Sequence, residues 1–528
     1  MAKPLTDRIE HVVVLMLENR SFDNVLGGLY PDRTRQGRYR GLWGTEANPL
    51  DPTKSGGASV MVFQGPAAQS TWIMPYPDPG ELYSDMVQQI FGSNSSVLPS
   101  GVLPPMSGFA WNYSGQSWSV SGPGWPSVPP VPRNIMQYYS EATMPATFAL
   151  AKAFAVCDCW FAAAPVQTLA NRVLAHCATP GRLASNFAMS RINNPDYFLD
   201  DFPLPVFDTT IFELLDKANP DGQAPACSNS PTPPTRLNWK VYYHDAPLSA
   251  FCYYVWDRWC FDYDYGGNVW GFEKSVLDPG FEADVEAGLL PTYSFIEPRY
   301  ADNNPDDLGI VNSNHPGGAG FDIKDPNGAS LPPPIDVLDG ERLLCRVYSI
   351  LRKHPDVFAK TLLIVTYDEH GGLFDRVGPP GAVSPFVPPV ANFSYDRYGV
   401  RVPVFLINPF IAPGTVYPTN QDRTKPIPSP FFDHTSILST LIAQFTSYPK
   451  GSLTPREKSA AELSGLISNT SYPPPECPAI PAAPTPRPAI ARPPRPPGTR
   501  IPGPPHPLAG PLSLLYRRIE RSRRRQRS

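Results

Sequence analysis

Two apolar stretches decide the fold of this 528-residue chain: His11–Leu17, which reads HVVVLML, and Leu362–Tyr367, which reads LLIVTY. Both are short, contain β-branched residues, and lack the polar–apolar alternation of a half-exposed strand. Such runs are typical of strands that are buried on both faces, as in a parallel sheet covered by helices on each side. They predict an α/β fold with a mostly parallel sheet flanked by helices.

The segments around these two stretches fit the same fold class. Shorter strands are predicted at Val241–Tyr243, Tyr293–Ile296 and Val402–Ile407. Helical patterns lie at Met144–Val156, Asp339–Lys353 and His434–Phe445, with Asp339 and Asp433 as expected N-caps. Strand and helix patterns are thus interleaved along the chain.

Proline is unusually frequent, with 69 residues, while the 41% of hydrophobic residues rules out wholesale disorder. Pro75–Pro132 is rich in Pro, Gly and Ser and carries Trp111, Tyr113, Trp118 and Trp125. We expect this region to be a long loop that forms a lid or a substrate wall. A second long loop is expected at Ala301–Pro334.

The C-terminal part of the chain differs from the rest in composition and charge. Residues 472–528 are proline-rich and then arginine-rich, which predicts an extended polyproline or disordered tail after a single domain at 1–471. Eleven Arg and two Glu give this tail a charge of +9, so the body carries −13 of the total of −4. We expect the tail to assist peripheral contact with an anionic membrane, with no nucleic acid bound. The alternatives are a solvated extension or a tail that folds back on the acidic body.

No segment reaches the ~18 apolar residues of a membrane span, and no ordinary secretory signal precedes the first strand. These features predict a cytoplasmic protein or one exported by a specialised route. The eight Cys match no zinc pattern. We expect mostly buried free thiols, with Cys252–Cys260 as the first pair to consider for a disulfide.

Acidic residues follow both of the strands that decide the fold. His11–Leu17 continues into Glu18-Asn19, and Leu362–Tyr367 continues into Asp368-Glu369. Because ligands of open α/β sheets bind beyond the carboxyl ends of the strands, these four oxygen-bearing side chains are expected to meet at one edge. Oxygen donors, most of them anionic, suit a divalent metal ion. The following Gly371-Gly372 is expected to let the chain turn sharply and a substrate approach closely.

The same motifs carry a family resemblance. Glu10–Gly28 (EHVVVLMLENRSFDNVLGG) and Thr361–Val377 (TLLIVTYDEHGGLFDRV) resemble the bacterial and plant phosphoesterase family, which includes the non-specific, phosphatidylcholine-type phospholipases C and related acid phosphatases. Further similar blocks follow in the same order, at Asp78–Gly92, Pro105–Tyr113, Phe154–Arg172, Trp239–Asp245, Tyr293–Tyr300 and Gly399–Val416. The resemblance spans about residues 5–470.

This resemblance implies an alkaline-phosphatase-like core and a set of site residues. The family's T-x-P-N-R segment reads Thr168-Leu169-Ala170-Asn171-Arg172 here, so Thr168 takes the role of nucleophile and Ala170 replaces the usual Pro. The implied ligands of a divalent ion (Ca²⁺, Mg²⁺, Mn²⁺ or Zn²⁺) are Glu18, Asn19, Thr168, Asp368 and Glu369. The remaining active-site positions match His244 and His315. Glu81 stands where the family usually has His, which places an anion where a cationic imidazolium could face the phosphate.

The residues and the resemblance together predict a metal-dependent phosphoric ester hydrolase. Thr168 would attack phosphorus and form a phospho-threonine intermediate, Arg172 would neutralise the phosphate oxygens, and His315 or His244 would protonate the leaving group. The expected substrate is a glycerophospholipid, cleaved as by a phospholipase C. The alternatives are a phosphomonoesterase acting on small phosphate esters and a non-catalytic protein that binds membranes.

Overall fold

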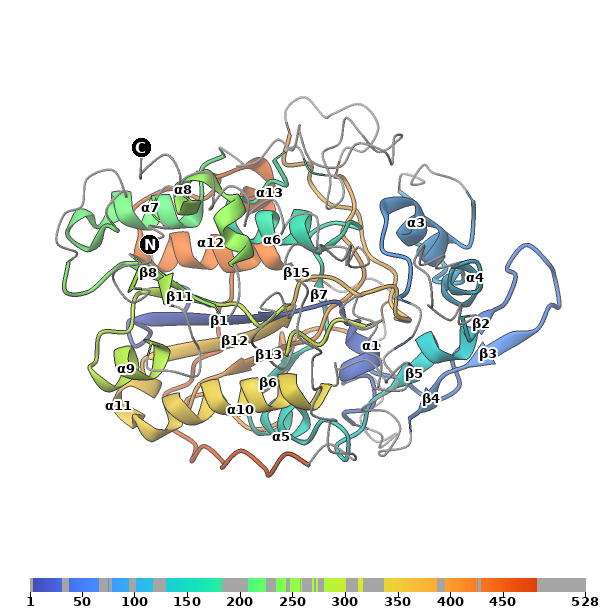
Figure 1. Ribbon diagram of the computed structural model, residues 1–528, viewed down its shortest axis with the longest axis horizontal. Helices are drawn as coiled ribbons and strands as arrows, with labels where there is room; N and C mark the ends of the chain where they lie inside the picture. The colour runs from blue at the N-terminus through green and yellow to red at the C-terminus, as the bar shows by residue number, and fades with distance from the viewer. Residues whose placement is uncertain are drawn as a thin grey trace, which may run out of the picture.

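The computed structural model describes residues 3–30, 38–65, 75, 78–94, 101–116, 130–181, 183, 208–224, 234–243, 247–256, 258, 268–269, 272–273, 280–300, 312–316, 337–386, 395–423, 425 and 429–481. Within them, a central sheet lies between two layers of helices (Figure 1). This arrangement confirms the predicted fold class.

The central sheet has the strand order β14-β6-β13-β12-β1-β11-β8-β10-β9. The strands β12, β1, β11 and β8 at its centre are mutually parallel, whereas β13 is antiparallel to both of its neighbours. Their bounds are β1 His11–Leu17, β6 Ala155–Cys157, β8 Trp239–Tyr242, β9 Asn268–Val269, β10 Phe272–Glu273, β11 Tyr293–Ile296, β12 Thr361–Tyr367, β13 Val404–Ile407 and β14 Thr415–Tyr417. All five strands predicted from the sequence are present, with small differences in their ends.

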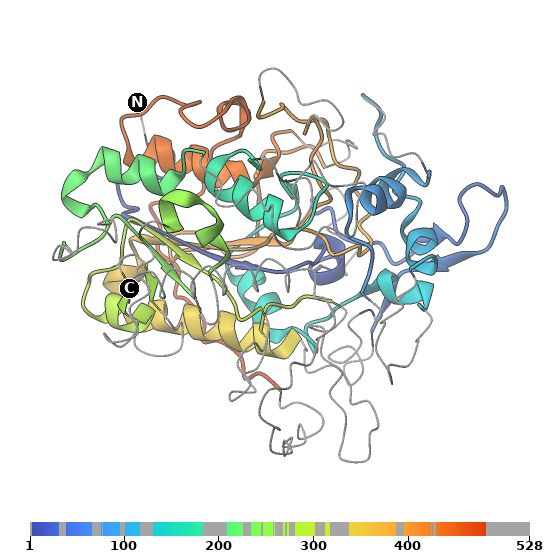
Figure 2. The ribbon, with the colours of Figure 1, turned by 45° about the horizontal axis from the view of Figure 1, so that its top comes forward.

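Helices cover both faces of this sheet (Figures 1 and 2). One layer contains α6 (Thr168–Cys177), α7 (Ile211–Ala218), α8 (Tyr253–Trp256), α12 (His434–Phe445), α13 (Pro455–Ser459), η4 (Pro220–Gly222) and η6 (Leu248–Phe251). The other contains α5 (Pro145–Ala153), α9 (Gly280–Glu286), α10 (Val337–Lys353) and α11 (Pro355–Phe358). Asp433 caps α12 as predicted, by accepting from the backbone N–H groups of Thr435 and Ser436. Asp339 is not the N-cap of α10, because that helix begins two residues earlier and places Asp339 in its first turn.

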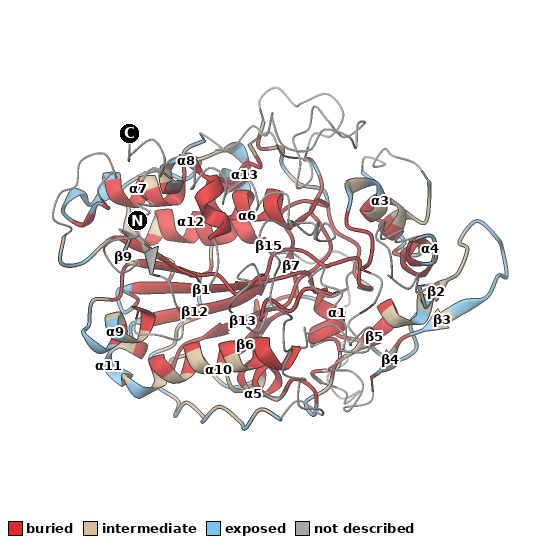
Figure 3. Cartoon of the chain, viewed as in Figure 1, coloured by how far each residue is buried: buried red, intermediate tan, exposed pale blue. Residues whose placement is uncertain are grey.

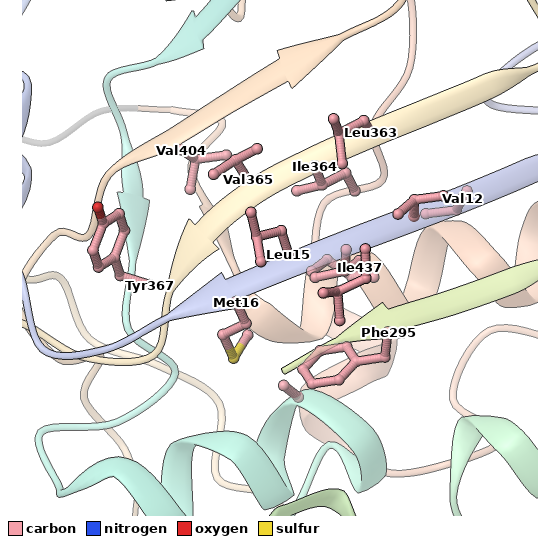
Figure 4. Packing of buried hydrophobic residues seen from close by; sticks show 14 of the residues in the cluster. Val12, Leu15, Met16, Phe295, Leu363, Ile364, Val365, Tyr367, Val404 and Ile437 are labelled. Carbon is pink, nitrogen blue, oxygen red and sulfur yellow. The ribbon is translucent and has the colours of Figure 1, made fainter. Parts of the chain in front are cut away.

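The core lies where the helices meet the two strands that decide the fold. β1 and β12 are buried over their whole length. Val12 and Leu15 of β1 lie beside the apolar side chains of β12, Met16 extends from β1 on the side away from β12, and Phe295 and Ile437 approach from β11 and α12 (Figure 4). Burial is continuous through the sheet and the helix surfaces that face it (Figure 3). Two-sided burial explains why these strands lack alternation in sequence.

A smaller lobe extends from the edge of the molecule near α1 (Phe22–Val25), at the right of Figure 1. It contains α3 (Tyr83–Phe91), α4 (Phe109–Ser114), η2 (Pro132–Met136) and the short strands β2 (Ala47–Pro49), β3 (Ser59–Met61), β4 (Phe63–Gln64) and β5 (Gln137–Tyr138). The prediction of one long loop at Pro75–Pro132 is therefore wrong. Both α3 and α4 bury apolar residues against each other, and the flanking Pro and Gly residues concealed these short helical patterns in the sequence. Trp118 and Trp125 lie outside the described residues.

The beginning of the predicted tail is attached to the body. Residues 472–481 lie extended along α10 (Figure 1, red trace at the bottom). A disulfide joins Cys345 of α10 to Cys477, and the Tyr348 hydroxyl donates to Pro475 O at 2.6 Å. The disulfide was not predicted, because its cysteines are 132 residues apart in sequence. Cys252 instead lies beside Cys177, with 3.6 Å between free thiols, and Cys260 is outside the described residues.

Candidate active site

The parallel pairing of β1 and β12 brings the two acidic motifs to one edge of the sheet. Leu17 and Tyr367 are register partners at the ends of these strands, so Glu18-Asn19 and Asp368-Glu369 leave the sheet side by side. All four side chains are buried. The strand ends therefore meet as the sequence predicted. The short β15 (Phe432–Asp433) and β7 (Trp160–Phe161) form a separate parallel pair that leads into α12.

Asn19 is the central residue of this arrangement. Its backbone has φ of 53°, in the left-handed region that Asn tolerates better than most residues, and its N–H donates to Asp368 Oδ1 at 3.0 Å. Its Oδ1 accepts from Thr168 Oγ1 at 3.0 Å, and its Nδ2 donates to Glu81 Oε1 at 2.7 Å. Asn19 thus connects both strand ends with Thr168 and with the segment before α3.

Thr168 is the first residue of α6 and is buried. The first N–H groups of a helix lack partners within the helix and carry a partial positive charge, which favours an anion such as phosphate beside this residue. The helix itself is anchored by Asn171, whose Nδ2 donates to Val166 O at 2.6 Å. The predicted nucleophile therefore lies at the anion-binding end of a rigid element, within hydrogen-bond distance of a predicted metal ligand.

Arg172 lies one turn further along α6 and points back to the strand ends. Its Nε forms an ion pair with Asp368 Oδ2 at 3.0 Å, and its Nη2 donates to Met16 O and Leu17 O at 3.2 Å. The guanidinium also lies over Tyr300, with its Cζ 4.9 Å from the ring centre. Nη1 has no hydrogen-bond partner within the described part of the chain. Arg172 thus holds Asp368 in place and keeps one nitrogen available for another acceptor.

The turn after β12 is built from two glycines with left-handed backbone. Gly371 and Gly372 have φ of 61° and 66°. A Cβ on Gly371 would lie 2.3 Å from Asn19 O, and one on Gly372 would lie 2.5 Å from Pro79 Cβ. The sharp turn was predicted correctly, but the close neighbours of both glycines are other parts of this chain.

Three of the histidines lie at the site: His315 is close to Asn19 and Glu81, whereas His434 and His370 hold the turn that follows β12. His315 Nε2 lies 2.9 Å from Asn19 Nδ2 and 3.6 Å from Glu81 Oε1. His434 Nε2 donates to Asp368 O at 2.7 Å, and His370 Nε2 donates to Gln89 Oε1 of α3 at 2.8 Å. Burial lowers the pKa of both supporting histidines, to about 3 for His370. His244, the other histidine predicted for the active site, lies outside the described residues.

Two more acidic residues lie beside the predicted ligands. Glu81 is buried and contacts Asn19, so the residue that departs from the family pattern is part of the site. Asp78 was missed in the sequence, and its Oδ1 lies 3.9 Å from His315 Nδ1. Only its place in the Asp78–Glu81 segment could have pointed to Asp78 as a site residue. No local feature of the sequence shows that this segment packs against the ends of the strands.

The electrostatics of the site favour a bound cation. Burial and the charge of Asp368 raise the pKa of Glu369 well above its usual value. Burial and the charges of Glu369, Asp368 and Glu18 do the same for Glu81. Glu369 Oε1 is buried and accepts no hydrogen bond from any described residue. Since a buried carboxylate oxygen without a partner is costly, the chemistry of these side chains fits a divalent metal ion, which the predicted ligands Glu18, Asn19, Thr168, Asp368 and Glu369 would hold.

None of the helices in the described part of the chain combines the length and the apolar composition needed to cross a bilayer.

Comparisons with known proteins agree with the resemblance. Residues 9–446 match the family model described as the Phosphoesterase family. Non-specific phospholipase C1 of Arabidopsis thaliana is 31% identical over 438 residues, covering 82% of this chain and 66% of that protein. Phospholipase C A of Mycobacterium tuberculosis is 27% identical, covering 84% of this chain and 73% of that protein. These matches confirm the predicted enzyme class, a hydrolase of phosphoester bonds.

Among solved structures, a protein of the alkaline phosphatase superfamily from Vibrio parahaemolyticus is 13% identical, with a TM-score of 0.31, over 60% of this chain and 63% of that one.

Proposed function

Because the chain belongs to the Phosphoesterase family, we propose that it is a metal-dependent phospholipase C, which cleaves a glycerophospholipid to diacylglycerol and a phosphorylated head group. The observation that carries this proposal is the position of Thr168 at the start of α6, with Oγ1 3.0 Å from Asn19 Oδ1 and beside buried carboxylates. The names of the Arabidopsis and Mycobacterium relatives support phospholipid as substrate.

In the proposed reaction the Thr168 hydroxyl gives up its proton to solvent as Oγ1 attacks phosphorus, and the bond from phosphorus to the glycerol oxygen breaks. The head-group phosphate remains on Thr168, and diacylglycerol leaves after its alkoxide takes a proton from His315 or His244. Water then gives a proton to that histidine and attacks phosphorus, which breaks the bond to Thr168 Oγ1; Oγ1 regains a proton from solvent, and the phosphorylated head group is released. A bound divalent ion would lower the pKa of the nucleophile and stabilise negative charge on the phosphate.

The side chains around Thr168 have supporting roles in this scheme. Asn19 accepts the hydrogen bond from Thr168 and so orients its oxygen. Arg172 positions Asp368 through their ion pair, and its Nη1, which has no hydrogen-bond partner among the described residues, is the group that could reach a phosphate oxygen. The N–H groups at the start of α6 would add further positive potential beside the phosphate.

Substitution of Thr168 tests the proposal. Thr168→Ala should lower turnover by roughly three orders of magnitude or more, because no other group supplies the attacking oxygen, whereas the matched Thr168→Ser should keep part of it. Rapid quenching should trap a phosphorylated Thr168 in the unmodified protein. An active Thr168→Ala variant, together with a quenched protein that never carries phosphate at this residue, would refute the assignment.

A comparison of substrates separates the main proposal from a phosphomonoesterase. Turnover on phosphatidylcholine and on p-nitrophenyl phosphate would be measured before and after dialysis against a strong chelator. We expect faster hydrolysis of the lipid, and loss of both activities in the metal-free protein. Faster hydrolysis of the monoester would favour the phosphomonoesterase, and full activity in protein shown to be metal-free would refute the metal requirement.

A further inference from the structure

A second group of ligand-type side chains lies next to the predicted metal ligands. It consists of Asp78, Glu81 and His315, which are all buried, and one ligand atom from each lies within 4.8 Å of the other two. Asp78 Oδ1 is 3.9 Å from His315 Nδ1, and Glu81 Oε1 is 3.6 Å from His315 Nε2. None of the three belongs to the five residues that the resemblance assigns to the metal.

The imidazole of His315 is held in the tautomer that binds metal ions. Its Nδ1 lies 2.6 Å from the carbonyl oxygen of Pro316, which can only accept a hydrogen bond, so Nδ1 carries the proton. The lone pair of Nε2 then points toward Asn19 Nδ2 and Glu81. An Nδ1–H that donates to a backbone carbonyl is the usual way in which proteins orient a metal-binding histidine.

Glu81 supplies a buried oxygen that lacks a partner. Its Oε1 accepts from Asn19 Nδ2 at 2.7 Å, but its Oε2 is buried and receives no hydrogen bond from the described residues. A cation would supply the missing partner, whereas the histidine expected at this position would bring no anionic oxygen.

We propose that Asp78, Glu81 and His315 form a second divalent-cation site, adjacent to the site formed by Glu18, Asn19, Thr168, Asp368 and Glu369. Asn19 connects the two sites, because its Oδ1 faces Thr168 while its Nδ2 holds Glu81. Two carboxylates and one imidazole favour Mn²⁺ or Zn²⁺ over Mg²⁺ or Ca²⁺, which prefer oxygen alone.

The role of the second ion rests on the proposed function. In phosphoester hydrolysis, paired cations stabilise charge on both the attacking and the leaving oxygen. His315 would then be a ligand, which assigns protonation of the leaving group to His244. Glu81 would thereby change a site with one cation and a facing histidine into a site with two cations.

Manganese binding tests the second site without any reference to turnover. Metal-free full-length protein would be dialysed to equilibrium against Mn²⁺, and bound Mn²⁺ would be counted per chain. We expect two ions in the unmodified protein and one each in Glu81→Gln and Asp78→Asn. The control is Glu141→Gln, which removes an exposed carboxylate (61% exposed) and should retain two ions. Electron paramagnetic resonance should show coupled Mn²⁺ ions in the unmodified protein and an isolated ion in the two site variants.

The outcomes separate this inference from the proposed function. One bound ion in the unmodified protein, or two in both site variants, would overturn the second site; if Glu81→Gln fails to fold, the unmodified protein and Asp78→Asn still decide. Hydrolysis of phosphatidylcholine by a protein that binds a single ion would leave the proposed function standing. Conversely, two ions in a protein that hydrolyses no phosphoester would support the site and refute the function.

Discussion

Removal of the disulfide between Cys345 and Cys477 is expected to destabilise the protein without affecting its chemistry. The bond joins α10, on the outer layer of helices, to the extended segment after residue 471. In the part of the chain that the structure describes, neither cysteine forms a hydrogen bond with a residue of the candidate site. Cys477→Ser should therefore lower the free energy of unfolding while turnover of the folded protein stays the same.

The size of the effect follows from the length of chain that the bond closes. The two cysteines are 132 residues apart, and the chain-entropy relation gives about 5 kcal/mol at 25 °C for a loop of this length. Measured losses for native disulfides are typically about 2–5 kcal/mol. The hydrogen bonds that Tyr348 donates to Pro475 O and Arg352 Nε donates to Pro474 O are present with and without the disulfide, so they cancel in the comparison and keep the segment attached. We expect a loss of about 3–5 kcal/mol.

Equilibrium unfolding in urea would measure this loss for Cys477→Ser, Cys345→Ser and the double variant. Because either substitution opens the same loop, the free energy of unfolding of the double variant should equal that of each single variant to within about a few tenths of a kcal/mol. The unmodified protein in the presence of a reductant should match them. Unchanged stability in the single variants, or losses that add in the double variant, would refute the reasoning.

Three further predictions concern the site, a buried histidine and the tail. Asp368→Asn should abolish turnover and lower the free energy of unfolding by about 3 kcal/mol, because it leaves the buried Arg172 without its anionic partner. Urea unfolding would measure the stability and lipid hydrolysis the turnover; a variant that keeps both would contradict this prediction. Burial, with Arg172 and His434 nearby, lowers the pKa of His176 to about 3. Below about pH 6.5 the unfolded chain therefore binds a proton that the folded protein does not bind, and the folded state loses stability as the pH is lowered. His176→Phe, which keeps a ring among Phe212 and Phe295, should therefore gain about 2 kcal/mol relative to the unmodified protein between pH 7 and pH 5; a pH-independent difference between their melting curves would argue against it. Truncation after Pro481, which retains the disulfide, should leave turnover on a soluble phosphodiester unchanged and weaken attachment to anionic vesicles at low salt; equal attachment would remove the membrane role of the tail.

Most of the framework could be predicted because its signals are local. The unalternating runs of β1 and β12 reflect burial on both faces, which is a property of each strand by itself. The Asp433 cap of α12 is likewise set by neighbours two and three residues away. The sequence predicted a loop where the short helices α3 and α4 lie between Pro and Gly residues. It also predicted Asp339 as the N-cap of α10, whereas that helix begins before this residue.

The sequence by itself determined the acidic motifs after two buried strands, the Thr168 segment and the family. These features depend on residue type and spacing along the chain, and parallel strands necessarily present their carboxyl ends at the same edge. Only the tertiary structure decided that Asp78 and Glu81 approach His315, that Arg172 pairs with Asp368, and that Cys345 bonds Cys477. Each of these contacts joins residues more than 130 positions apart. Such contacts are set by how whole layers pack, because no local preference of the backbone or the side chains distinguishes one distant partner from another.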